Sequence, residues 1–228
     1  MNHREEQRND LRLVGDSMSN GGFYGKVSLT GDAEFNGNVD CLSLKSTGNI
    51  KVDGSLRSGT LKTTGDLKIE GGLTVTEMSA TGEVWVKESI SGENMKIFGT
   101  CTVMSGIQTE RFKLKGVVQS EGMLNSETVE MVLFGKSYAA EIVGTRIEVQ
   151  PFGAQKWVPW LRMRGTPELE AQVIEGDVVS LENTKADTVR GGEVRIGPGC
   201  RIRLVEYSKS FHQDRQSEVA ESVRVTEH

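Results

Sequence analysis

Two stretches of the chain are nearly identical: "LKSTGNIKVDG" (Leu44–Gly54) and "LKTTGDLKIEG" (Leu61–Gly71), which begin 17 residues apart. Both alternate apolar and polar residues, as in "NIKVDG", where Ile50 and Val52 are apolar and Lys51 is not. Alternation with a period of two indicates a short β-strand with one buried face. A strand motif that recurs at a fixed period indicates a repeat architecture.

The 17-residue period extends well beyond these two stretches. In lines of 17 from Val27, "VSLTG", "LKSTG", "LKTTG", "MSATG", "MKIFG" and "FKLKG" stand beneath one another. The last residues of these words form one column, which we expect at the corners of the fold: Gly31, Gly48, Gly65, Gly82, Gly99 and Gly116. Three apolar columns share the period; their first members are Val27, Ala33 and Val39.

Three short strands per line, each followed by a corner, predict a three-sided β-helix in which the columns become stacked rows of side chains. A single line buries too few apolar side chains to offset the conformational entropy of ordering its backbone. Stacking supplies the missing stabilisation, because each strand pairs with the rungs above and below at a spacing of about 4.8 Å. The expected fold class is therefore all-β, a solenoid with about 17 residues per rung.

The strength of the repeat divides the chain into five expected segments. They are a flexible N-terminal segment (1–21), the main β-helix (22–149), a connector (150–168), C-terminal β-helical rungs (169–207) and a flexible tail (208–228). The connector is expected because "PFGAQKWVPWLRMRGTPELE" holds three of the four prolines, and a central strand rarely tolerates proline.

The C-terminal rungs are predicted from a weaker echo with a period of 16 residues. It aligns Val173, Val189 and Val205 in one column, and it also stacks the pairs Gly176 and Gly192, Val178 and Val194, and Ala186 and Ile202. Two further rungs are expected from this pattern. They would either cap the main β-helix or extend it.

Composition and charge exclude several classes of function. A net charge of −5 and a pI near 5.4 argue against binding to nucleic acid. The start "MNHREEQRND" is too polar for a signal peptide, and nowhere do 18 apolar residues run together. We expect a cytoplasmic protein that reaches the inner face of the membrane only through partners. Cys41, Cys101 and Cys200 lack metal-site spacing and are expected to be reduced and structural.

An enzyme of the hexapeptide-repeat acyltransferase type is one alternative, prompted by "VRIGPGCRI" (Val194–Ile202). Such coils have close to 18 residues, and their chemistry needs a histidine general base. The three histidines, His3, His212 and His228, all lie in expected tails. We therefore predict no catalytic, cofactor or metal site, and we assign the acidic residues that follow corner glycines, such as Asp32 and Asp66, to corner hydrogen bonding.

The run "FYGKVSLTGDAEFNGNVDCLSLKSTGNIKVDGSL" and its 17-residue continuation resemble the bactofilins, the polymer-forming cytoskeletal proteins of bacteria. The resemblance covers residues 22–149, with a weaker continuation to Tyr207. It implies a right-handed β-helix that polymerises end to end without nucleotide and scaffolds cell-envelope, cell-shape or motility (flagellar) machinery. The membrane-targeting start of many members is not evident in "MNHREEQRND", so the resemblance does not predict direct membrane binding.

Three sets of residues are candidates for interaction surfaces. The apolar run "VEMVLFG" is the expected polymer interface at the C-terminal edge of the regular repeat, with Val129, Met131, Leu133 and Phe134. A stripe of Lys45, Lys62, Lys96 and Lys113 could meet an acidic partner or anionic lipid, although solvation of a flat β-face is the favoured interpretation. Trp157 and Trp160 could anchor a partner or pack the connector onto its own domain.

The sequence thus predicts a self-assembling scaffold whose main partner is a second copy of itself. A paralogous bactofilin and envelope or flagellar proteins are further expected partners. A soluble adaptor that does not polymerise is the other alternative, and it would apply if the C-terminal rungs covered the interface.

Overall fold

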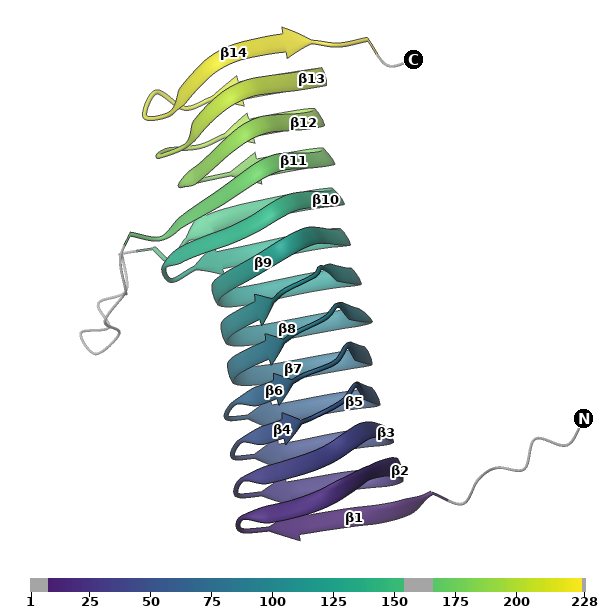
Figure 1. Cartoon of the computed structure of the whole chain (residues 1–228). Coiled ribbons are helices and arrows are strands. Elements are labelled where there is room, and N and C mark those ends of the chain that lie inside the picture. Colours follow the sequence, from purple (N-terminus) through teal and green to yellow (C-terminus); the bar gives the residue numbers. More distant parts are fainter. Residues whose placement is uncertain (1–7, 154–165, 227–228) are drawn as a thin grey trace, which may run out of the picture.

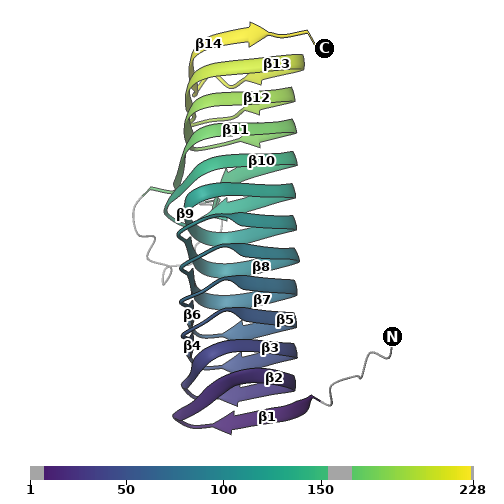
Figure 2. The same cartoon turned by 45° about the vertical axis from the view of Figure 1, so that its right-hand side comes forward.

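The computed structural model describes residues 8–153 and 166–226. These residues form one parallel sheet of 14 strands, wound into a right-handed β-solenoid. Figures 1 and 2 show a single continuous stack that begins with β1 (Asn9–Val14, purple) and ends with β14 (Glu218–Arg224, yellow). The first and last rungs therefore lie at opposite ends of the molecule.

The remaining strands are long because many continue through a corner. They are β2 (Ser17–Thr30), β3 (Ala33–Thr47), β4 (Ile50–Val52), β5 (Leu56–Thr64), β6 (Leu67–Ile69), β7 (Leu73–Val86), β8 (Ile90–Val103), β9 (Ile107–Leu133), β10 (Lys136–Pro151), β11 (Glu168–Leu181), β12 (Thr184–Ile196) and β13 (Arg201–Gln213).

Each regular turn has three sides, and each side points two residues inward. In one turn the buried pairs are Leu44 with Ser46, Ile50 with Val52, and Leu56 with Ser58. The strand pairing stacks equivalent residues of successive turns, so each inward column becomes a continuous row. One row has twelve members: Leu11, Val27, Leu44, Leu61, Met78, Met95, Phe112, Val129, Ile147, Val179, Val194 and Phe211.

The corner glycines are confirmed, and the structure shows why no other residue fits. Gly48 has φ = 116°, a backbone conformation that side chains with a Cβ rarely adopt. A Cβ at this position would also lie 2.2 Å from the carbonyl oxygen of Gly31 in the turn below. The other glycines of the column repeat this geometry, so each corner packs backbone directly on backbone.

Both terminal segments were wrongly predicted to be flexible. The segment 1–21 contains β1 and the start of β2, and the tail 208–228 contains the end of β13 and all of β14. These strands lack the glycine column and are more polar than the central turns, which is why the pattern did not reveal them. Their backbone groups nevertheless pair with the adjacent turns.

The C-terminal rungs extend the main β-helix. Strand β10 pairs with β9 on one side and with β11 on the other, so the connector interrupts the sequence without interrupting the stack. The expected register of these rungs was wrong by one residue between β11 and β12: Val189 pairs with Ile174, and Val194 pairs with Val179. The next step, Val189 with Val205 and Ala186 with Ile202, is as predicted.

Candidate assembly surfaces

The acidic residues at the regular corners have a structural role. The Asp32 side chain accepts a hydrogen bond from the Asn49 N–H of the next turn, and the Asn49 side chain accepts one from the Asp66 N–H, both at 3.1 Å. Asp66 accepts in the same way from the Glu83 N–H. Among the described residues, no three His, Cys, Asp or Glu side chains gather in a way that could hold a metal ion.

The predicted polymer interface is not an end of the stack. Val129, Met131 and Leu133 are buried, with at most 1% of their surface exposed. Strand β10 covers them and pairs Val129 with Ile147 and Met131 with Val149. The prediction failed because the loss of the 17-residue register after Val129 was taken for the end of the fold, whereas the backbone continues to stack.

Phe134, the fourth residue of that prediction, lies in a cluster of three aromatic rings at the glycine corner. Its N–H donates to the Gly116 carbonyl in the turn below. The Phe134 ring makes edge-to-face contacts with Phe98 and Phe152, at centroid distances of 5.7 and 5.0 Å. Phe98 remains 49% exposed, so one ring of the cluster faces solvent.

The N-terminal end of the stack leaves one edge of β1 without a partner strand among the described residues. Leu11 and Leu13 point inward at this end and are only partly buried, because no turn lies beneath them. Val14 and Met18 are exposed on the sides of the same turn, at 66% and 72%. The end therefore combines unpaired backbone groups with uncovered apolar side chains.

The C-terminal end has the same character. Strand β14 pairs with β13 alone within the described chain. Phe211 and Val219 are partly buried against the core, and the Phe211 ring packs on Tyr207 with a centroid distance of 5.4 Å. Val223 and Val225 are about 40% exposed, at 39% and 41%.

The lysine stripe is on the surface, as the pattern indicates. Lys45, Lys62 and Lys96 are exposed, whereas Lys113 is partly buried and pairs with Glu130 at 2.8 Å. The other surface candidates, Trp157 and Trp160, lie outside the described residues.

The cysteines are structural, and the expectation that Cys200 might be exposed is wrong. All three thiols are free and buried. Burial raises the pKa of Cys101 to about 12 and that of Cys200 to about 11, which keeps both thiols protonated and unreactive. His212, which was expected in a tail, is instead an exposed residue of β13.

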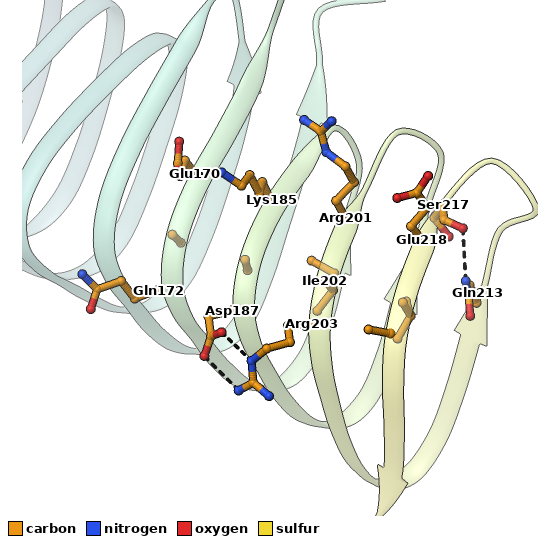
Figure 3. Close-up of a pocket in the computed structure, with 14 residues that line it drawn as sticks. Glu170, Gln172, Lys185, Asp187, Arg201, Ile202, Arg203, Gln213, Ser217 and Glu218 are labelled. Carbon is orange, nitrogen blue, oxygen red and sulfur yellow. Dashed lines mark hydrogen bonds and ion pairs between the residues drawn. The ribbon is translucent and has the colours of Figure 1, made fainter.

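An open groove of about 820 Å³ runs over the C-terminal turns, and Figure 3 shows the residues that line it. Its charged residues balance one another. Lys185 pairs with Glu170 at 3.1 Å, and Arg203 donates two hydrogen bonds to Asp187. The Arg203 guanidinium thereby lowers the pKa of the Asp187 carboxyl. This balance leaves the groove without a preference for a charged ligand.

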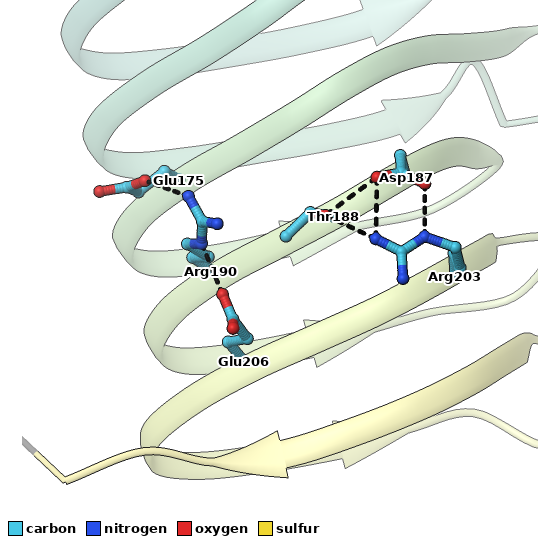
Figure 4. Close-up of polar contacts among 6 residues, drawn as sticks. All are labelled: Glu175, Asp187, Thr188, Arg190, Arg203 and Glu206. Atoms are coloured by element: carbon cyan, nitrogen blue, oxygen red, sulfur yellow. Dashed lines mark hydrogen bonds and ion pairs between the residues drawn. The ribbon is translucent and has the colours of Figure 1, made fainter.

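A second ion-pair network ties three successive turns together on another side. Arg190 lies between Glu175 of the turn below and Glu206 of the turn above, as Figure 4 shows. The network crosses turns in the region where the corner glycine column has ended. Its place in the stack indicates a role in register and stability.

Comparisons with known proteins identify relatives but no function. The chain is 44% identical to the uncharacterized protein YhbE of Bacillus subtilis (strain 168) over 105 residues, which are 46% of this chain and 44% of that protein. It is 41% identical to the uncharacterized protein YhbF of the same strain, over 46% of this chain and 42% of that protein. The match thus covers less than half the length of either relative. No model of a known protein family matches the chain, and no solved structure matches it significantly.

The two ends were missed by sequence reasoning. Leu11, Leu13, Phe211 and Val219 occupy segments that read as polar tails. One available signal was the alternation in "LRLV", where Leu11 and Leu13 have the spacing of an inward pair. Within the described residues, no helix is long and apolar enough to cross a membrane.

Proposed function

We propose that the protein is a self-assembling scaffold of bactofilin type that polymerises end to end without nucleotide. The supporting observation is the pair of open end rungs. Each presents unpaired strand edges and apolar residues in line with the core rows, and an edge of this kind is a template for another strand. A second copy stacked on either end would continue the rows and pair the backbone groups.

The biological role follows from the bactofilin resemblance. A rigid polymer with laterally accessible faces would organise cell-envelope, cell-shape or motility machinery in a bacterium, with those proteins bound along its sides. Two relatives in one Bacillus strain favour a paralogous chain as an additional subunit. The protein would act in the cytoplasm by position and binding, and it would need no catalytic residue.

The experiment compares two arginine substitutions at neighbouring positions of the N-terminal turn. Leu13→Arg places a charge on the open end, whereas Val14→Arg places the same charge on the side of the turn. Analytical ultracentrifugation and negative-stain microscopy without nucleotide should show large assemblies for the unmodified protein and for Val14→Arg. Leu13→Arg should sediment as small species while keeping its β-rich circular dichroism spectrum.

Two results would contradict the proposal. If Leu13→Arg assembled like the unmodified protein, the N-terminal end would not be an interface. If the unmodified protein sedimented as a monomer at high concentration, the adaptor alternative would replace the scaffold.

A further inference from the structure

The lysine stripe is part of a wider surface that the structure assembles from three adjacent rows. These rows are the outward residues on the strand that precedes each corner glycine, from β1 to the Arg111–Lys115 part of β9. We call this surface the basic face. Its eight cationic residues outnumber its two carboxylates, Asp10 and Glu77, and they are Arg12, Lys26, Lys45, Lys62, Lys96, Arg111, Lys113 and Lys115.

Most of these cations have no counter-ion on the protein. Within the described chain, Lys26, Lys45, Lys62, Lys96 and Lys115 form no ion pair. All five are exposed. Their charges are therefore available to an external anion.

The next side of the same turns has the opposite charge. Nine carboxylates follow the corner glycines there, against Lys51, Lys68 and Lys87, and they are Asp16, Asp32, Glu34, Asp53, Asp66, Glu70, Glu83, Glu88 and Glu121. Lys51 and Lys68 on this side are neutralised locally by Glu34, Asp53 and Glu70, at 2.6 to 2.9 Å. The solenoid is electrically two-sided although its net charge is −5.

The basic face also carries features that suit phosphate groups. A shallow depression of about 410 Å³ lies around Ser79, between Lys62 and Lys96. These two lysines are two rungs apart, which corresponds to about 10 Å along the stack. A phosphate over Ser79 would receive the hydroxyl of Ser79 and a charge from either side, and Thr60 and Asn94 line the same depression.

An exposed aromatic ring borders the same surface. Phe98 is 49% exposed, lies two residues from Lys96 and pairs in register with Lys115. Apolar rings next to lysines are typical of surfaces that rest in the headgroup region of a bilayer, where the ring is inserted and the ammonium groups meet phosphates. A partner protein would more commonly be recognised by a pocket that fits its shape, whereas this face is shallow and regular.

We infer that the basic face binds the surface of an anionic phospholipid bilayer, with the acidic side turned away from it. The seven rungs of the face span about 30 Å, enough for several lysines to contact headgroups at once. This binding would not require self-assembly, since the whole face belongs to one chain. It also differs from attachment through a terminal segment, because the site is a side of the solenoid.

The test is cosedimentation of the full chain with vesicles of phosphatidylcholine alone or mixed with phosphatidylglycerol. The unmodified protein should bind only the mixed vesicles. The triple variant Lys45→Gln, Lys62→Gln, Lys96→Gln should bind them roughly a hundredfold more weakly, given the contribution of each lysine near an anionic surface. The matched control Lys51→Gln, Lys68→Gln, Lys87→Gln has the same net charge, alters the acidic side and should bind like the unmodified protein.

Ionic strength gives a second measurement that needs no variant, because bilayer binding through exposed lysines should decrease strongly as salt is added. Equal binding by the two triple variants, or equal binding to neutral vesicles, would overturn the inference. So would tighter binding to a short DNA duplex than to the mixed vesicles. Sedimentation of each variant without vesicles separates this question from self-assembly: if only the basic-face variant lost its assemblies, the face would be a contact between copies instead.

Discussion

The turns from Val27 to Gly116 and the turns from β10 onwards form the same solenoid by different local means. In the first region every paired residue lies 17 positions from its partner, as in Leu44 with Leu61. In the second the separation varies: it is 18 between Val129 and Ile147, 15 between Ile174 and Val189, and 16 between Val189 and Val205. The stack therefore requires aligned inward residues and does not require turns of constant length.

The corners explain why one region can be regular and the other cannot. Regular corners place glycine on glycine and connect neighbouring turns through Asp and Asn side chains, and this geometry leaves no room for an additional residue. The later corners use other residues, such as Asn183 with φ = 45° and Gly199 packed against its side chain. Ion pairs between turns, such as Arg190 with Glu175 and Glu206, occur where the glycine column has ended.

If both regions share one core, a buried charge should be equally harmful in either. Leu67 in the regular region and Ile174 in the later region are both buried, at 1% and 0% exposure. Leu67→Asp and Ile174→Asp should each destabilise the protein by about 3 to 5 kcal/mol, because neither aspartate would find a partner in the apolar row. Chemical denaturation followed by circular dichroism measures both.

Lys68→Asp is the control for these substitutions, because it introduces the same residue on the outer surface. Lys68 contacts Glu70 at 2.9 Å and lies 4.8 Å from the Trp85 ring centre, so a small loss of stability is expected. A loss as large as that of Leu67→Asp would contradict the assignment of inner and outer residues. A much smaller loss for Ile174→Asp would show that the later turns are only loosely joined to the core.

The glycine corner can be tested with a pair of alanine substitutions. Gly65 has φ = 119°, and a Cβ there would lie 2.4 Å from the Gly48 carbonyl oxygen, so Gly65→Ala should cost about 2 to 4 kcal/mol. At Gly72 a Cβ would be 3.4 Å from the nearest atom, the Ser89 carbonyl oxygen. Gly72→Ala should therefore change stability by less than about 1 kcal/mol. Equal melting temperatures for the two variants would show that the corner relaxes.

The sequence predicted the regular region well because its signal and its structure share one period. The inward rows through Leu44 and Ile50 and the corner at Gly48 could be identified from alternation and glycine spacing alone. The later turns were only partly predicted, because a constant 16-residue period cannot represent separations that change between 15 and 17.

The candidate surfaces were harder to predict than the fold. Val129 and Leu133 were assigned to an end because an apolar run beside a fading repeat has the same appearance whether another turn covers it or not. The basic face was seen only as one row of lysines. Its other cations, such as Lys26 and Lys115, belong to rows on either side that become neighbours only when the turns are stacked in register.

The smallest expected effect concerns the ion pairs of the later turns. Hydrogen bonds from Arg203 lower the pKa of Asp187 in the folded protein relative to the unfolded chain. The stabilisation from this pair is therefore present above about pH 4, the ordinary range of an aspartate, and is lost as the pH falls through the lower folded pKa. Asp187→Asn should lower the melting temperature slightly near neutral pH, and the difference from the unmodified protein should shrink in acid.

Glu193→Gln is the matched control, since Glu193 is an exposed residue of the same strand, β12, and forms no ion pair among the described residues. It should leave the melting temperature unchanged at both pH values. Because the Asp187 pair is exposed to solvent, its contribution should also decrease with added salt. A pH-independent difference for Asp187→Asn would instead assign its effect to the hydrogen bond with Thr188, which does not require a charge on Arg203. In that case ion pairing would not be what holds the later turns in register, and their irregular spacing would rest on side-chain packing alone.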